Sequence, residues 1–269
     1  MALNGFAAYR GRLKPRIDAE LKLRLGEWFP GLPEVHRQAL HEILAEGKRI
    51  RALLTCLVAE ALGARLEQAL PAALAVEMIQ AASLVHDDFV DGDTVRRGRP
   101  AAWTKLSPRR AVLLADLVFA TAIETMARAG RREGETLAHA IATMAQGALQ
   151  EALGAGERPR PGRDAYRRVI HLKTGSLFAA AASLGALAAG ADERTLEAAA
   201  QFGACTGALY QIADDLADDP KAAPALRGCM EEETAALVEQ ARCALTEFPD
   251  NECTRMLAEM PRELARIAS

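Results

Sequence analysis

Residues 75–91 read AVEMIQAASLVHDDFVD, an apolar run with helical spacing that ends in aspartates. A second stretch of the same design, AAAQFGACTGALYQIADDLADD, occupies residues 198–219. Apolar residues that recur three and four positions apart predict helices with buried apolar faces. Acid at the C-terminal end of a helix is unfavourable, because the macrodipole already places partial negative charge there. A bound cation would resolve this conflict, so both helix ends are candidate metal sites.

The composition predicts an all-α protein. The 269 residues are 50% hydrophobic, only 4% aromatic, and dominated by alanine and leucine, which favour helices over sheets. Helical periodicity continues from about residue 15 to the C-terminus, and no break is long or biased enough to be an interdomain linker. We therefore expect residues 1–269 to form a single domain.

Several classes of protein are disfavoured by charge and patterning. The net charge of −3 and the lack of a long basic stripe argue against a nucleic-acid partner. The first residues contain no apolar core of a signal peptide, and the weakly polar run at 177–191 is too short to span a bilayer. We expect a cytoplasmic protein without a transmembrane segment. The five cysteines are scattered and form no CxxC pair, so neither a disulfide framework nor a zinc site is predicted.

The aspartates at the two helix ends have a spacing suited to Mg²⁺. Side chains four apart lie on one helix face, so each end offers a stacked carboxylate pair with one flanking acid. Hard oxygen ligands without neighbouring histidine or cysteine suit Mg²⁺, which takes one or two carboxylates and completes its shell with water and phosphate oxygens. The stacked pairs are Asp87 with Asp91 and Asp214 with Asp218, and the flanking acids are Asp88 and Asp215.

Basic residues near these acids favour a diphosphate ligand. The sequence RRGR at 96–99 follows the first acidic cluster closely, and arginines can grip phosphate oxygens in pairs. The segment GKRIR at 47–51 places Lys48 and Arg51 on one helix face, and HLKTGSLF at 171–178 carries Lys173. Taken alone, either segment has an ordinary explanation, a solvated face or a tolerated helix glycine.

Together these motifs resemble the trans-isoprenyl diphosphate synthases, the polyprenyl synthetase family. GKRIR, EMIQAASLVHDDFVD, RRGRP, KTGSLF and YQIADDLAD occur in the family's order and rough spacing, and the resemblance extends from about residue 10 to residue 219. It implies an isoprenoid-synthase-type helical bundle around a central cavity that opens between the two acidic helix ends. It also implies a homodimer and three Mg²⁺ ions that hold an allylic diphosphate.

The resemblance assigns roles by position. It implies a transferase that joins isopentenyl diphosphate to the allylic diphosphate, with catalysis resting on the acidic clusters and Lys173. Gln80 stands where the family usually has a histidine associated with isopentenyl diphosphate. The implied metal ligands are Asp87, Asp88, Asp91, Asp214 and Asp218. The residues implied to bind the allylic diphosphate are Arg96, Lys173, Thr174 and Gln211. The residues implied to bind isopentenyl diphosphate are Lys48, Arg51 and Arg97.

Product length in this family depends on the helix wall below the first acidic motif. Ala82 and Ser83, the fifth and fourth residues before Asp87, are both small, and Met78 is the next candidate for the floor. The resemblance therefore implies a product of twenty carbons or more. In this mechanism the released pyrophosphate takes the proton, so we expect a structural role for His86 rather than that of general base.

The sequence departs from the family after residue 219. The family usually continues with a segment of the type GKDxxxGKxT, whose lysine reaches the allylic diphosphate, but DDPKAAPALRG follows here. The domain is therefore shortened, and Lys221 is a candidate replacement for the lysine. Trp103 replaces a frequent histidine, and we expect it to serve in packing.

Three other functions fit parts of the sequence. A noncatalytic or weakly active partner subunit of a full-length prenyl diphosphate synthase would explain Gln80 and the shortened tail. An ionisation-only, terpene synthase-like enzyme would consume the allylic diphosphate without condensation. A di-iron bundle would also place carboxylates on facing helices, but it requires Glu-x-x-His pairs, which are not found beside these clusters.

Overall fold

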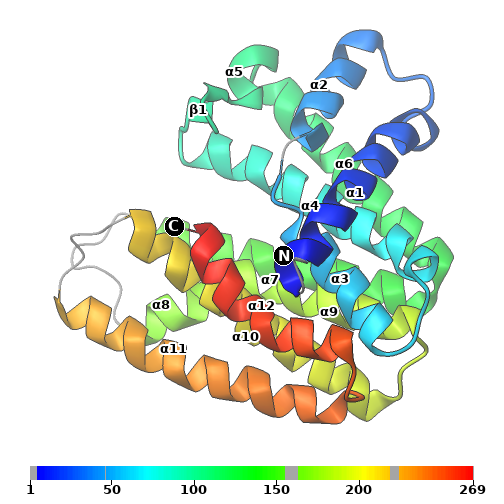
Figure 1. Cartoon of the computed structure of the whole chain (residues 1–269). Coiled ribbons are helices and arrows are strands. Elements are labelled where there is room, and N and C mark those ends of the chain that lie inside the picture. The colour runs from blue at the N-terminus through cyan, green and yellow to red at the C-terminus, as the bar shows by residue number, and fades with distance from the viewer. Residues whose placement is uncertain (1–4, 46, 155–162, 219–223, 269) are drawn as a thin grey trace.

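The computed structural model describes residues 5–45, 47–154, 163–218 and 224–268, and it confirms the all-α prediction (Figure 1). The helices are joined by short loops, and one small hairpin interrupts them. The bounds are α1 Phe6–Trp28, α2 Glu34–Ala45, α3 Ile50–Ala61, α4 Leu66–Val90, β1 Val95–Arg96, β2 Arg99–Pro100, α5 Ala102–Leu106, α6 Pro108–Ala129, α7 Arg131–Gly154, α8 Arg163–Val169, the π-helix η1 Ile170–Gly175, α9 Ser176–Ala188, α10 Glu193–Asp218, α11 Pro224–Ala244, the 3₁₀ turn η2 Leu245–Glu247 and α12 Glu252–Ala268.

The two acidic helices occupy the centre of the bundle. α4 packs against α3, α6 and α9, while α10 packs against α9, α11 and α12, so α9 contacts both acidic helices. In Figure 1, α11 lies beside α10, whereas α12 crosses in front of α10 and also packs against α3 and α1. The buried apolar side chains form one cluster that joins the first helix to the last, from Phe6 to Leu264. The two acidic helices are therefore held in a common core.

Burial explains why two helical segments are apolar enough to resemble membrane spans. Leu66–Val90 and Asp164–Ala188 pass a length and hydropathy criterion for spanning helices, and 72% and 67% of their most apolar windows are buried inside the bundle. Helices that are apolar all round belong in the core of a large protein or in a membrane. The run at 177–191, expected to be a buried helix, falls mostly in α9, whose side chains are largely buried.

A glycine allows the close approach of α9 and α10. A Cβ added at Gly203 of α10 would clash with the Phe178 carbonyl oxygen and would lie 2.8 Å from its carbon. Small residues at a helix contact let the backbones come together, which here holds the helix of the second acidic motif against the core.

The RRGR segment forms the hairpin. Arg96 pairs with Arg99 across the antiparallel strands, and the turn residues Arg97 and Gly98 both have positive φ, 52° and 73°. Two left-handed residues are the signature of a type I′ turn, which fits the twist of a tight hairpin. Trp103 donates an indole hydrogen bond of 2.8 Å to the Asp93 carbonyl and so packs this region onto the end of α4.

Candidate active site

A cavity of about 780 Å³ lies where the C-terminal ends of α4 and α10 face η1, α7 and the residues before α3. Its volume is in the range of small-molecule sites. The structure brings most of the predicted site residues together here, although they come from separate parts of the chain. Those that line the cavity are Lys48, Arg51, Gln80, Ser83, Asp87, Asp91, Arg96, Arg97, Lys173, Thr174, Gln211 and Asp214.

The first acidic motif divides between two sides of α4. Asp87 and Asp91, four residues apart, both line the cavity. Asp88 is turned about 100° from Asp87 by the helix and is buried, with only 3% of its surface exposed. Its carboxylate accepts a hydrogen bond of 2.6 Å from Arg96 Nε and pairs with the second guanidinium arm as well. Asp88, expected to bind metal, is therefore outside the cavity lining and is held by Arg96.

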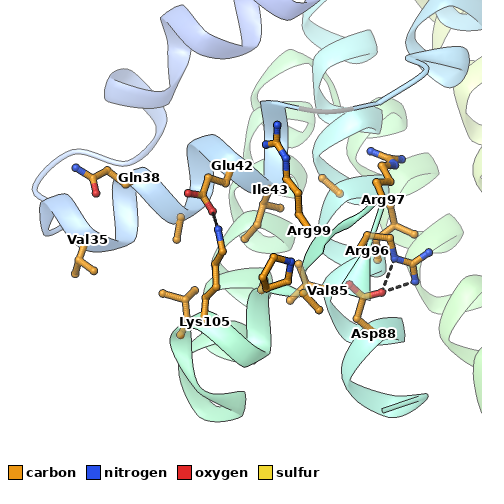
Figure 2. Close-up of a pocket in the computed structure, with 17 residues that line it drawn as sticks. Val35, Gln38, Glu42, Ile43, Val85, Asp88, Arg96, Arg97, Arg99 and Lys105 are labelled. Atoms are coloured by element: carbon orange, nitrogen blue, oxygen red, sulfur yellow. Dashed lines mark hydrogen bonds and ion pairs between the residues drawn. The ribbon is translucent and has the colours of Figure 1, made fainter. Parts of the chain in front are cut away.

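Figure 2 shows this Asp88–Arg96 pair at the edge of a second, smaller cavity of about 310 Å³. The smaller cavity lies between α2, α4 and the hairpin, with Arg97 and Arg99 along its rim. Arg96 and Arg97 line both cavities. Arg96, predicted to bind substrate, has a structural role in the fold, because its guanidinium neutralises the buried carboxylate of Asp88.

The second acidic motif has a similar division. Asp214 lines the cavity, whereas Asp215 is absent from its lining and accepts hydrogen bonds from Tyr166 (2.6 Å) and from the Gln211 amide (2.7 Å). Gln211 in turn accepts a hydrogen bond of 2.8 Å from the Thr174 hydroxyl. The side chain of Asp218 and all of Lys221 lie outside the described residues, as does most of the segment where the family's lysine would occur.

Lys173 lies between the acidic groups. It is carried by the π-helix η1, a geometry common at functional sites. Its Nζ is 2.5 Å from Glu151 and 3.7 Å from Asp87. Burial disfavours the ammonium charge, but these carboxylates outweigh it, and the pKa of Lys173 is raised. Burial also raises the pKa of the Asp87 carboxyl, against the effect of Lys173.

The basic residues of GKRIR lie against aromatic rings. Lys48 Nζ is 3.4 Å from the Tyr210 hydroxyl, and the Arg51 guanidinium lies 4.5 Å from the centre of the Phe178 ring. Burial lowers the pKa of Arg51 to about 10, although Glu77 opposes this shift. The cation–π contact helps to hold the Arg51 guanidinium in the cavity lining.

Arg49, which the sequence did not single out, supports this basic segment from behind. It is buried, with left-handed φ of 57°, and its Nε donates to Asp18 at 2.6 Å. Its other arm lies 3.4 Å from Glu77, which also accepts the Ala52 amide at 3.1 Å. One signal was present in the sequence: Glu77 is an isolated acid in an apolar helix, and such a charge requires a buried partner.

The residues expected to set product length are only partly in the cavity. Ser83 lines it, whereas Met78 and Ala82 are fully buried in the core and do not. Nine residues at about 3.6 per turn make two and a half turns, so Met78 lies on the face of α4 opposite Asp87. The positions of Met78 and Ala82 do not support the expected role in the wall. Phe119 of α6 and Ile141, Met144 and Ala148 of α7 form the apolar side of the cavity instead.

His86 has surroundings that fit a structural role. Its ring lies 5.4 Å from that of Phe119, and its Nε2 lies 3.2 Å from Asp116 without the alignment of a hydrogen bond. The residue lines the cavity but contacts α6.

The donor set fits Mg²⁺ bound jointly with a phosphate ligand. Asp87, Asp91 and Asp214 supply hard oxygens around the cavity, but the described residues contain no cluster of three or more acids, histidines or cysteines close enough to hold a metal by themselves. Mg²⁺ characteristically uses one or two carboxylates and fills its shell with water and substrate oxygens. Cations such as Lys173 and Arg51 would face the remaining phosphate oxygens.

Comparison with known proteins gives consistent matches. Residues 33–224 match the family model described as Polyprenyl synthetase. The chain is 37% identical over 187 residues to the geranylfarnesyl diphosphate synthase of Methanosarcina mazei, covering 70% of this chain and 62% of that protein. It is 40% identical over 203 residues to heptaprenyl diphosphate synthase component 2 of Geobacillus stearothermophilus, and the match covers 75% of this chain and 62% of that protein. The chain thus matches about three fifths of the length of these relatives.

Solved structures share the fold over nearly the whole chain. A decaprenyl diphosphate synthase of Rhodobacter capsulatus superposes with a TM-score of 0.78 at 26% identity, covering 96% of this chain and 97% of that one. A polyprenyl synthase of Caulobacter crescentus, solved with calcium and isoprenyl diphosphate, gives a TM-score of 0.82 at 25% identity. The match covers 98% of this chain and 99% of that one.

Proposed function

Because the chain belongs to the polyprenyl synthetase family, we propose that it is a Mg²⁺-dependent prenyltransferase that condenses isopentenyl diphosphate with an allylic diphosphate. The observation that carries this proposal is the single cavity that joins three aspartates to two separate groups of cations. One group, Lys48 and Arg51, is carried by the segment at the start of α3, and the other includes Lys173. Two diphosphates need two such groups.

The allylic diphosphate is assigned to the side with Asp87, Asp91 and Asp214. Bound Mg²⁺, three ions by resemblance, would neutralise the negative charge that develops on the departing diphosphate. Lys173 adds positive charge at the same place, and Thr174 and Gln211 add polar contacts. Such preorganised charge stabilises the ionisation of the carbon–oxygen bond.

Isopentenyl diphosphate is assigned to Lys48, Arg51 and Arg97, with Gln80 beside them. Its alkene attacks the allylic carbon, a carbon–carbon bond forms, and the proton lost from the adduct passes to the released pyrophosphate. Glutamine at position 80 supplies hydrogen bonds without positive charge. The apolar side of the cavity keeps water away from the cation, which would otherwise be hydrolysed.

We also propose that α6 and α7 form a subunit interface. Leu113 and Leu117 of α6 are 60% and 38% exposed, and Leu149 of α7 is 65% exposed. The two helices pack side by side, so their apolar residues can form one patch, and such patches mark interaction sites. A second copy is the occupant expected from the family resemblance, in a cytoplasmic homodimer.

A partner-subunit function is the main alternative. One relative is named component 2 of a heptaprenyl diphosphate synthase, which describes part of an assembly. In that case the α6 and α7 surface would bind a different chain, and the isolated protein would be inactive or weakly active.

The test is to incubate the purified chain with Mg²⁺, labelled isopentenyl diphosphate and dimethylallyl, geranyl or farnesyl diphosphate in turn, and to size the products. Elongated products would support the synthase and give its primer and product length. Consumption of the allylic diphosphate alone would indicate an ionisation-only enzyme, and intact substrates would favour the partner subunit. Asp214→Asn is expected to abolish elongation, and Asp250→Asn, at a 91% exposed side chain, is the matched control.

A further inference from the structure

The second aspartate of each acidic motif is held by a donor from another part of the chain. Asp88 pairs with Arg96 of the hairpin, and Asp215 accepts a hydrogen bond of 2.6 Å from Tyr166 of α8. In both motifs the preceding aspartate lines the large cavity and the held aspartate does not. Arg96 is already assigned to the allylic diphosphate, whereas Tyr166 has no role in the proposed chemistry.

The hydrogen bonds that start at Tyr166 have a fixed direction. An ionised carboxylate only accepts, so the Gln211 nitrogen must face Asp215, as the 2.7 Å contact requires. The Gln211 oxygen then points the other way and accepts from the Thr174 hydroxyl at 2.8 Å. A tyrosine phenol is protonated at neutral pH, so Tyr166 donates its hydrogen to the Asp215 carboxylate at 2.6 Å.

The direction of these hydrogen bonds decides which donors and acceptors Gln211 and Thr174 offer to a ligand. Both residues line the large cavity, whereas Tyr166 and Asp215 do not. An amide nitrogen has two hydrogens, and the bond to Asp215 uses one of them, which leaves a second N–H donor. The Thr174 hydroxyl donates its one hydrogen to the Gln211 oxygen, so its part in this network is to hold the amide rather than to donate to an anion. A reversed amide would exchange donor for acceptor beside any bound phosphate.

We infer that Tyr166 is a positioning residue that, through Asp215, fixes the Gln211 amide with its second N–H available to a diphosphate ligand, while Thr174 holds the amide oxygen. This inference rests on the proposed function, which assigns a diphosphate to the cavity. Tyr166 touches no substrate in this assignment, and it acts only through the residues that do.

Equilibrium binding of inorganic pyrophosphate in the presence of Mg²⁺ tests the inference. Tyr166→Phe removes one hydroxyl and is expected to weaken binding about 10-fold, the lower end of the loss when an outer partner of a ligand-binding group is removed. Tyr9→Phe is the matched control, because Tyr9 is a buried tyrosine that donates to the carboxylate of Glu60 outside the cavity lining. Its thermal stability is expected to fall while pyrophosphate binding stays at the wild-type level.

A coupling measurement distinguishes positioning from general loss of structure. If Tyr166 acts through Asp215, Tyr166→Phe will cause no further loss in an Asp215→Ala background. An equal loss in both backgrounds would contradict the inference. In enzymatic assays, the KM for the allylic diphosphate is expected to rise more than the KM for isopentenyl diphosphate.

A ligand-free measurement separates this inference from the proposed function. The Gln211 side-chain amide resonance, assigned by its disappearance in Gln211→Ala, is expected to shift in Tyr166→Phe and to stay in place in Tyr9→Phe. An unshifted signal would overturn the inference even if pyrophosphate binds. Failure of the wild-type protein to bind pyrophosphate would count against the proposed function, while the amide shift would still support the role of Tyr166.

Discussion

Gly147 of α7 lies directly against the backbone nitrogen of Lys173: a Cβ added at Gly147 would be 2.6 Å from that nitrogen and 2.9 Å from the Leu172 Cβ. The π-helix that carries Lys173 therefore packs on α7 at a distance that only glycine permits. The position of the lysine between the acidic groups depends on this contact.

Replacing this glycine is expected to move the lysine. We predict that Gly147→Ala lowers the free energy of unfolding by about 1–3 kcal/mol, the usual cost of overpacking, and weakens Mg²⁺-dependent pyrophosphate binding. Gly26→Ala is the control, because Gly26 lies inside α1 with no atom near an added Cβ, and there alanine should stabilise by up to about 1 kcal/mol. Urea unfolding measures both changes, and equal stability of the Gly147→Ala and wild-type proteins would contradict the packing argument.

Glu77 is predicted to be essential for stability as well as for the shape of the cavity. Its side chain is 6% exposed and its partner Arg49 is 2% exposed. Without Glu77, Arg49 keeps only Asp18 as a carboxylate partner and the Ala52 amide loses its acceptor, so Glu77→Ala should cost about 1–3 kcal/mol in unfolding free energy. Glu124→Ala, which breaks the exposed pair with Arg128, should have little effect in the same denaturation experiment. Similar small losses in the two variants would show that the pair with Asp18 is enough to hold Arg49.

His171 of η1 is predicted to make the protein less stable in mild acid. Burial lowers the pKa of its imidazole, and Arg167 adds to this effect while Glu233 opposes it. The unfolded chain therefore takes up a proton near pH 6.5, before the folded chain does, so this contribution to stability is lost as the pH falls below that value. His171→Gln should flatten the dependence of the melting temperature on pH in that range. The same substitution at the exposed His41 serves as control, and an unaltered slope in His171→Gln would assign the acid sensitivity elsewhere.

Product length is predicted to respond to Ser83 and not to Met78. Ser83 lines the cavity, so Ser83→Phe should block it and shorten the product in the elongation assay. Met78 is buried on the opposite face of α4, so Met78→Ala should leave the product distribution unchanged while costing about 2–5 kcal/mol in stability. Longer products from Met78→Ala would restore the role first expected for that residue.

The fold and most of the cavity follow from local patterns in the sequence. Helical periodicity predicts α4 and α10, and spacing within each acidic motif correctly places Asp87 and Asp91 on one face. Motif order also identified Lys48 and Lys173, because each lies in a short segment with its own signature.

What the sequence could not predict depends on contacts between distant segments. Asp88 and Asp215 look the same as their neighbours in a motif, and only the positions of Arg96 and Tyr166 show that they are held away from the cavity. Ala82 and Met78 are four residues apart and lie on the same side of α4. That side faces the protein core rather than the cavity. The depth of burial around Arg49 likewise arises from α1 and α4 together, which no local pattern describes.

The contact between Lys173 and Glu151 has a consequence for which anions the cavity accepts. The ammonium group is already engaged by an internal carboxylate at 2.5 Å, so an incoming anion must compete with Glu151 for it. An anion of low charge gains little from that exchange, whereas a more highly charged one gains more electrostatic energy at the same position. Under the proposed function, this exchange would favour a diphosphate over a prenyl monophosphate or an ordinary carboxylate, and Glu151, whose side chain is 52% exposed, can leave the lysine at little cost.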